Sequence, residues 1–268
     1  MARFTALVLA GRRNAEDSLA RSRGATHRAM LEVGGAPMLL RVVRALRASP
    51  GIGCVSVSID DPRALDEVPE LKAALAVGDL RVHRSLDSPS RSVSDVLAGC
   101  APDEALLVTT ADHPLLAPDI VEHFTAAAER SEADLLLGVV SRSLLDARYP
   151  ETTRTYLRLR GEAWTGANLF CFRTGRARRA ADFWVRAERQ RKRPWRLAWA
   201  FGPTALILFL LRQLDLDAAL ERASRAIGVR IRAVPLPFPE AAIDVDRVTD
   251  LMLAERILAE REVRASGG

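Results

Sequence analysis

Aromatic residues and cysteines are scarce in this chain of 268 residues. Aromatic side chains make up 5% of the sequence, so the core must be aliphatic, built mostly from leucine, valine and alanine. The three cysteines, Cys54, Cys100 and Cys171, are odd in number and far apart, a pattern that excludes a disulfide framework and lacks metal-site spacing. We expect buried free thiols in a reducing compartment. The chain opens directly into a predicted strand, so we expect no signal peptide and a cytoplasmic protein.

Long apolar segments and the common nucleotide-binding loops are also missing. The apolar run 197–211 is too short to span a bilayer and is interrupted by Gly202 and Pro203. Neither GxxxxGK[ST] nor GxGxxG occurs, which excludes a P-loop and the usual dinucleotide fingerprint. The net charge of +5 favours anionic partners: nucleotides, phosphorylated metabolites or acidic lipid. Because the basic residues are mostly scattered arginines without interleaved aromatics, we expect no nucleic-acid partner.

Strand-like and helix-like patterns alternate along the chain. The predicted strands are 4–10, 53–59, 80–84, 105–110, 134–140, 168–173 and 229–234. The predicted helices are about 37–48, 63–75, 92–99, 118–130, 175–190, 203–225 and 247–264. This alternation predicts an α/β fold with a Rossmann-like, doubly wound, mainly parallel sheet. We expect a single domain over 1–268, a helical and basic subdomain at about 175–226, and a loop or hairpin over the site at 141–167.

Two predicted strands, far apart in sequence, end abruptly at carboxylates. One apolar run ends at Asp112, and a later one ends at Asp244 and Asp246. Ligands bind where the strands of an open α/β sheet end, so these carboxylates are candidate metal or substrate groups. Simpler roles stay open: a turn at Asp112, a helix N-cap at Asp246, and a favourable charge in the first helical turn at Asp250. Asp244 is an alternative ligand to Asp246.

The segment after the first strand is long, polar and rich in arginine. It runs from Gly11 through Arg12 and Arg13 to Gly24 and Arg28. Free backbone N–H groups at a strand end, together with guanidinium groups, are suited to hold phosphates. A solvated surface loop is an equally good interpretation of this segment alone.

Four short motifs follow one another in a fixed order. They are Leu9-Ala-Gly-Arg12 with Arg28-Ala-Met-Leu-Glu-Val-Gly-Gly-Ala-Pro-Met-Leu39, Thr110-Ala-Asp112-His-Pro114, Thr165-Gly166-Ala-Asn168-Leu-Phe170, and Ile243-Asp-Val-Asp246 with Asp250. Together they resemble the GT-A-type nucleotidyltransferase superfamily. Its members include molybdenum cofactor guanylyltransferases, N-acetylglucosamine-1-phosphate uridylyltransferases and small cytidylyltransferases. The resemblance extends over nearly the whole chain and is specific for the superfamily, not for one subfamily.

The resemblance implies an Mg²⁺-dependent nucleotidyltransferase that moves a nucleoside monophosphate from an NTP to a phosphorylated small molecule and releases pyrophosphate. It implies nucleotide binding by Leu9, Ala10, Gly11, Arg12, Arg13, Arg28 and Ser92, metal binding by Asp112 and Asp246, and acceptor binding by Gly166 and Asn168. Arg28 and Asp112 would be the catalytic residues. Mg²⁺ needs only one or two carboxylates besides phosphate oxygens. His113 is a secondary candidate, because an ionised acceptor phosphate needs no general base.

Some positions depart from the family pattern or allow a simpler explanation. Arg28 stands where the family usually has lysine, and the loop after Gly11 is poor in glycine. Ser92 and its neighbouring serines are suited to cap a helix as well as to meet a base edge. Asn168 is also explained by side-chain hydrogen bonding, and Gly166 by close backbone approach.

Other functions stay open at this point. Among acceptors, the sequence favours a sugar, polyol or alcohol phosphate over molybdopterin, because the loop lacks the glycine-dense form that contains lysine. A glycosyltransferase of the same fold should carry D-x-D, and Asp112-His-Pro lacks the second aspartate. A catalytically silent nucleotide-binding or membrane-associated protein would explain the missing lysine. The Trp/Arg-rich segment 184–199 suits either peripheral contact with the inner face of a membrane or a helical subdomain on the sheet.

Overall fold

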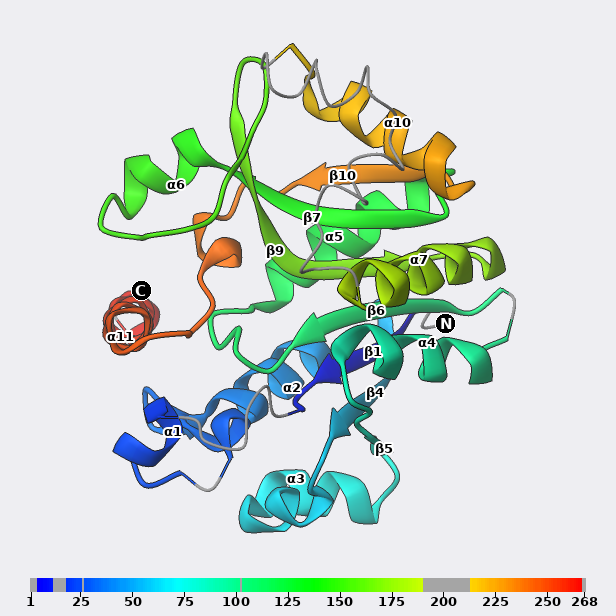
Figure 1. Ribbon diagram of the computed structural model, residues 1–268. Helices are drawn as coiled ribbons and strands as arrows, with labels where there is room; N and C mark the ends of the chain where they lie inside the picture. Colours follow the sequence, from blue (N-terminus) through cyan, green and yellow to red (C-terminus); the bar gives the residue numbers. More distant parts are fainter. Residues whose placement is uncertain (1–3, 12–17, 26, 102, 190–212, 267–268) are drawn as a thin grey trace.

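The computed structural model describes residues 4–11, 18–25, 27–101, 103–189 and 213–266. A single large sheet runs through the molecule, with helices on both faces (Figure 1). Its strands are β1 (Phe4–Leu9), β4 (Ile52–Ile59), β5 (Leu80–Arg84), β6 (Ala105–Thr110), β7 (Leu135–Ser141), β8 (Leu157–Arg158), β9 (Ala163–Phe172) and β10 (Ile231–Pro235). Within the described residues the order across the sheet is β10-β7-β9-β6-β1-β4-β5, and β8 pairs with β9. A short hairpin of β2 (Glu32–Val33) and β3 (Ala36–Pro37) lies apart from it.

The sheet is mainly parallel, as the alternation of elements predicts. β1 runs parallel to both β4 and β6, β4 to β5, and β7 to β10. β9 is the antiparallel strand, and it lies between β6 and β7. The central strand reads Phe-Thr-Ala-Leu-Val-Leu, and its middle residues are fully buried, because both faces of the sheet are covered. The predicted α/β class is confirmed.

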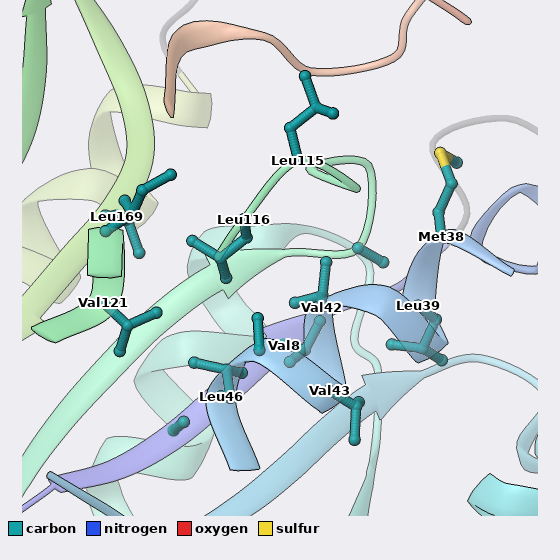
Figure 2. Close-up of a cluster of buried hydrophobic side chains, with 14 of the residues drawn as sticks. Val8, Met38, Leu39, Val42, Val43, Leu46, Leu115, Leu116, Val121 and Leu169 are labelled. Carbon is teal, nitrogen blue, oxygen red and sulfur yellow. The ribbon is translucent and has the colours of Figure 1, made fainter. Parts of the chain in front are cut away.

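The helices divide into two layers that cover opposite faces. They are α1 (Ser18–Ser22), α2 (Met38–Ala48), α3 (Pro69–Ala76), α4 (Pro89–Gly99), α5 (Pro118–Arg130), α6 (Arg142–Arg148), α7 (Arg178–Arg189), α10 (Leu216–Ile227) and α11 (Val248–Ser266). One core contains Val8 of β1 with Val42 and Leu46 of α2, and Figure 2 shows these side chains meeting. The other core contains Leu7 with Val93 of α4. Neighbouring residues of β1 thus enter different cores, because successive side chains of a strand point to opposite faces.

Short 3₁₀ turns join several of these elements. They are η1 (Arg28–Met30), η2 (Pro62–Glu67), η3 (Gly175–Ala177) and η4 (Pro239–Ala242). The prediction of one continuous helix over 63–75 is wrong, because the segment forms two helices. The 3₁₀ turn η2 ends before Val68, and α3 starts at Pro69. Val68 has an extended backbone, because a following proline disfavours the helical conformation.

The segment 141–167 is more ordered than its sequence predicts. It contains the helix α6, whose N-cap Ser141 accepts a hydrogen bond from the Leu144 amide. It also contains the antiparallel pair of β8 with β9, so the predicted hairpin is present. The predicted strand 168–173 starts too late, because β9 begins at Ala163. The first residues of β9, which the prediction missed, are paired with β7. This long-range pairing stabilises a strand whose local sequence pattern is weak.

The late helical insertion is described in part. α7 and α10 pack against each other, and α10 packs on β10. Residues 190–212 lie outside the described residues, and with them most of the Trp/Arg-rich segment 184–199 and the first part of the predicted helix 203–225. Arg12 and Arg13 lie outside the described residues as well. Among the helices of the described ranges, none has the length and apolar character needed to cross a membrane.

Candidate active site

The carboxyl ends of β1, β4 and β6 open into a cavity of about 1030 Å³. The motifs that are far apart in the sequence come together here. The predicted site residues that line it are Leu9, Ala10, Gly11, Arg28, Ser92, Asp112 and Asn168. Asp246 does not line this cavity but contacts Arg28, which does. The cavity lies where an open α/β sheet binds its ligands.

The end of β1 is held by backbone bonds and by close packing. The Ala10 amide donates to Ser58 O at 2.8 Å, and the Ala111 amide donates to Leu9 O at 2.9 Å. A Cβ on Gly11 would lie 2.6 Å from Ser85 Oγ and 3.2 Å from Ser85 Cβ, so a larger residue here requires the Ser85 side chain to move.

Ser92 supports the loop beside the cavity. Its hydroxyl accepts from the Leu86 amide at 2.9 Å and donates to Ser88 O at 3.2 Å. Ser88 is the N-cap of α4, since its side chain accepts from the Arg91 amide. The capping interpretation therefore holds for Ser88, whereas Ser92 fixes the shape of the rim.

His27 holds the turn that carries Arg28. The imidazole is buried; its Nδ1 accepts from the Ala29 amide at 3.1 Å, and its Nε2 lies 2.9 Å from Asp60 Oδ1. Since Nδ1 accepts, Nε2 carries the proton and donates to Asp60. Sequence reasoning did not single out His27, because its partner Asp60 is 33 residues away and follows a different strand.

Arg28 connects the first motif with the last. Its Nη2 donates to Val245 O at 2.6 Å and to Asp246 Oδ1 at 2.8 Å, across a separation of more than two hundred residues. The Val245 amide in turn donates to Asp112 O at 2.8 Å. These bonds bring Arg28, Asp112 and Asp246 to one place.

A buried ion pair fixes the acidic segment that contains Asp244 and Asp246. Arg154 donates to Asp244 Oδ1 at 2.5 Å and to Asp244 O at 2.9 Å, and it reaches Asp250 Oδ1 at 3.5 Å. Its side chain is only 9% exposed, so this guanidinium is largely removed from water. Sequence reasoning missed Arg154, which lies in the segment 141–167 predicted as a loop or hairpin.

Asp250, in the first turn of the last helix, binds backbone amides that precede the helix. Its Oδ2 accepts from the amides of Asp246 at 3.1 Å and Arg247 at 2.9 Å. The Asp246 carboxylate contacts Arg28, and its N-cap role stays a prediction. Asp250 does more than add a negative charge to the first helical turn, because its carboxylate accepts hydrogen bonds from two backbone amides.

The acidic strand ends influence one another electrostatically. The pKa of Asp244 is raised by burial, and the charges of Asp112 and Asp246 raise it further, against the opposing effect of Arg154. Three carboxylates thus lie within electrostatic reach, and a divalent cation would relieve their repulsion. In the described ranges no three His, Cys, Asp or Glu side chains converge closely enough to form a complete metal site by themselves.

The two predicted acceptor residues differ in their surroundings. Asn168 lines the cavity and donates from Nδ2 to Asp244 Oδ2 at 3.3 Å. Its φ of 50° is unusual for a residue other than glycine, although asparagine tolerates it best. Gly166 is exposed, lies opposite Val139 in β7 and does not line the cavity. A Cβ there would meet open space, so close approach does not require this glycine.

His113 is buried beside the acidic segment and does not line the cavity. Burial lowers the pKa of its imidazole to about 4, despite the nearby charge of Asp244. It is therefore neutral at physiological pH, and its place inside the protein favours a packing role over proton transfer.

The chain was compared with solved structures and curated proteins. A hypothetical transferase from Thermus thermophilus is 32% identical, with a TM-score of 0.75 over 93% of this chain and 99% of that one. A CMP:2-keto-3-deoxy-manno-octonic acid synthetase complexed with CTP is 13% identical, with a TM-score of 0.58 over 97% and 100%. The 4-diphosphocytidyl-2C-methyl-D-erythritol synthase from Anaerococcus prevotii is 11% identical, with a TM-score of 0.55 over 96% and 99%. The last two show the fold alone. A sequence search of curated proteins finds no match.

A family model covers most of the residues that line the cavity. The MobA-like NTP transferase domain matches residues 6–147, which include Leu9–Gly11, Arg28 and Asp112. More than half of the chain is matched, and the mixed sheet with its rim cavity is consistent with this family. The chain belongs to the family of the MobA-like NTP transferase domain and is a nucleotidyltransferase.

Proposed function

We propose that this nucleotidyltransferase moves a nucleoside monophosphate from an NTP to a phosphorylated small molecule, namely a sugar, polyol or alcohol phosphate. The observation that carries the proposal is a cavity in which the Gly11 rim, Arg28 and Asp112 meet. A rim of backbone amides with a guanidinium suits a triphosphate, and an adjacent carboxylate suits its metal ion.

The nucleotide would lie against the end of β1. Leu9, Ala10 and Gly11 offer a close approach to backbone, and the loop held by Ser92 closes the other side. Arg28 would neutralise the triphosphate in place of the usual lysine, because its guanidinium keeps a positive charge at every working pH. Arg12 and Arg13 are assigned to the same task from the sequence.

Asp112 and Asp246 would hold Mg²⁺. Their oxygen donors suit this ion, which needs few protein carboxylates and keeps several waters. When bound, the ion would neutralise charge on the phosphate oxygens of the NTP. Burial is the main cause that raises the pKa of Asp244, and the charges of Asp112 and Asp246 add to it, so the three carboxylates lie near enough to share a cation.

The reaction requires alignment more than proton transfer. An oxygen of the acceptor phosphate attacks the α-phosphorus, a new P–O bond forms, and the bond to the β-phosphate oxygen breaks as pyrophosphate leaves with its electron pair. The attacking oxygen is already ionised, so no general base is needed. The protein's task is to hold two polyanions in line. Asn168 lies in the cavity beside Asp244 and would orient the acceptor.

The structural neighbours support a small-molecule acceptor. One neighbour is a synthetase for CMP-2-keto-3-deoxy-manno-octonic acid and another a 4-diphosphocytidyl-2C-methyl-D-erythritol synthase. Their names describe nucleotide adducts of a sugar acid and a polyol. This chain is less than 15% identical to both. The experiment below is therefore designed to identify both the nucleobase of the NTP and the acceptor that this chain uses.

The test is pyrophosphate release from each of the four NTPs with Mg²⁺, against sugar, polyol and alcohol phosphates and molybdopterin. We expect release with one NTP–acceptor pair. Asp112→Ala should lower its rate about a thousandfold, because a metal ligand contributes several kcal/mol of charge stabilisation. The exposed Asp66→Ala is the matched control and should retain the activity. No release with any pair, or equal rates in both variants, would overturn the proposal.

A further inference from the structure

The strand that carries Asn168 has a bulge at this residue. The register between β7 and β9 shifts between Leu137 and Val139, where one residue of β7 lies opposite three residues of β9. The three residues are Ala167, Asn168 and Leu169. Bulges next to active sites redirect a side chain that regular pairing would keep in register. The redirected side chain here is Asn168, which lines the cavity at the edge of the sheet.

The bulge is fixed by packing on both sides of Asn168. Ala167 and Leu169 belong to the buried core, whereas Asn168 between them is only partly buried. On β7, a Cβ at Gly138 would lie 3.1 Å from Leu169 Cβ and 3.5 Å from Ala167 Cβ, so the glycine leaves room for the bulge. The φ of 50° at Asn168 is a sparsely populated conformation, which persists only where the surroundings enforce it. The backbone at Asn168 is therefore held in one conformation by its neighbours.

The side-chain amide of Asn168 is oriented by Asp244. Its Nδ2 donates to Asp244 Oδ2 at 3.3 Å. An ionised carboxylate accepts hydrogen bonds and donates none, so the nitrogen of the amide, and not its oxygen, faces Asp244. The amide has a second N–H and an acceptor oxygen besides this bond. Because the side chain lines the cavity, these two groups are suited to bind an oxygen atom of a ligand there.

Asp244 is in turn held by Arg154. The Nη1 of Arg154 donates to Asp244 Oδ1 at 2.5 Å, and its Nη2 donates to Asp244 O at 2.9 Å. The side chains of Arg154 and Asp244 are 9% and 21% exposed, so water competes little for these bonds. One oxygen of the Asp244 carboxylate thus binds Arg154 and the other binds Asn168. Arg154, Asp244 and Asn168 form a continuous chain of hydrogen bonds that ends at the cavity.

We propose that Arg154 and Asp244 are positioning residues for the acceptor. They act through Asn168, whose amide they hold in the one orientation that binds an oxygen of the phosphorylated acceptor. This inference rests on the proposed function and adds two residues to its acceptor side. It assigns Asp244 to the acceptor, whereas Mg²⁺ remains with Asp112 and Asp246. The bonds that form and break at phosphorus stay as described above, because neither positioning residue touches the reacting atoms.

The first experiment separates the acceptor from the nucleotide. The KM values are measured from pyrophosphate release with glucose 1-phosphate, glycerol phosphate or ethyl phosphate, whichever the native chain uses fastest. Asp244→Asn keeps the size of the side chain but leaves it one acceptor oxygen, for which Arg154 and Asn168 then compete. We expect the KM of the acceptor to rise about tenfold or more, because a hydrogen bond to a charged group is lost. The KM of the NTP should change less than about threefold, since the nucleotide half is untouched.

The control Asp79→Asn makes the same change at a carboxylate that is 55% exposed and paired with Arg47. It should change neither KM. A rise in both KM values of Asp244→Asn, or in that of the NTP alone, would indicate general damage or a role in nucleotide binding and would overturn the inference.

The second experiment asks whether Arg154 and Asp244 act through Asn168. Asn168→Gly removes the amide and keeps the backbone, because glycine adopts a φ of 50° without strain. Asp244→Asn and Arg154→Lys, which keeps the charge but loses the paired donors, should each raise the KM of the acceptor in the native chain. In the Asn168→Gly background they should raise it less than about twofold further, since the group through which they act is gone. Equal fold-changes in both backgrounds would overturn the inference.

A third measurement needs neither ligand nor turnover. The chain contains only two asparagines, Asn14 and Asn168, so selective ¹⁵N-asparagine labelling gives two side-chain amide signals, and Asn168→Gly identifies the one from Asn168. In Asp244→Asn, whose own amide adds one signal, we expect the Asn168 amide protons to exchange with water about tenfold faster or more, because their bond to the carboxylate is lost. Unchanged exchange would overturn the inference and leave the proposed function intact. The absence of pyrophosphate release with every acceptor would instead contradict the proposed function, and with it the acceptor role of these residues.

Discussion

The two halves of the site are held in different ways. The nucleotide half, at the ends of β1, β4 and β6, is fixed by backbone hydrogen bonds and by small residues in close contact, such as Gly11 against Ser85. The acidic half, around the segment after β10, is fixed by buried charged side chains from distant parts of the chain, such as Arg154 with Asp244. The first depends on shape and the second on charge, so different substitutions should damage them.

Removal of Arg154 should have the largest effect. Arg154→Ala leaves Asp244 and Asp250 without their buried guanidinium, and breaking such a pair costs about 3–5 kcal/mol. We expect the free energy of unfolding to fall by about that amount, measured in urea. The matched control is Arg225→Ala, because Arg225 forms an exposed pair with Glu221 and should contribute about 0.5 kcal/mol or less. Equal losses in the two variants would show that charge does not hold the acidic half.

Acid should also weaken the acidic half. The pKa of His113 is lowered by burial from its ordinary 6.5 to about 4, so between these values the unfolded chain binds a proton that the folded protein does not. The contribution of the neutral His113 to the free energy of unfolding is therefore fully present above pH 6.5. The free energy of unfolding should fall by about 3 kcal/mol as the pH falls to 4.

The check on this acid effect is urea unfolding in metal-free buffer at several pH values, for the native chain and His113→Gln. The variant cannot titrate at this position, so its stability should change less over the same range. Parallel curves for both proteins would contradict the expected role of His113.

The nucleotide half should instead be sensitive to a single methyl group. Gly11→Ala forces a Cβ to within 2.6 Å of Ser85 Oγ, and an overpacked site of this kind costs about 1–3 kcal/mol. We expect weaker NTP binding by titration calorimetry and a lower free energy of unfolding. In Gly99→Ala the new Cβ meets nothing within 4 Å at the end of α4, so stability should stay the same or rise slightly. Normal NTP affinity in Gly11→Ala would contradict the expectation that close packing of Gly11 against Ser85 shapes the nucleotide half of the site.

Arg28 joins the halves, and its conservative replacement should have the smallest effect. Arg28→Lys keeps the charge and one donor toward Val245 O and Asp246, so we expect the KM of the NTP to change less than about tenfold. Arg28→Met, of similar length and without charge, should raise it by about 10- to 100-fold, because bonds to charged groups contribute about 1.5–3 kcal/mol. Equal KM values in both variants would exclude an electrostatic role for Arg28.

Most of the architecture could be predicted from local patterns. Apolar runs such as Phe4–Leu9 and Ala105–Thr110 indicated buried parallel strands, and the helix-like pattern over about 37–48 indicated the helix that the structure has at Met38–Ala48. The start of β9 at Ala163 was missed, because its first residues pair with β7 and have little pattern of their own. The helix α6 was missed for its shortness, since seven residues give fewer than two turns of periodicity.

The sequence by itself determined which residues are candidates for the chemistry, because glycine, arginine and aspartate are the residue types that phosphate and Mg²⁺ require at strand ends. Arg28 and Asp112 were identified in this way, whereas Asn168 was taken from the resemblance of its motif to the superfamily. Only the tertiary structure decided which of them meet, and which supporting groups hold them: His27 through Asp60, Asp246 through Arg28, and Asp244 through Arg154. The reason is physical, since hydrogen bonds and ion pairs act over a few ångströms of space, whatever the distance along the chain.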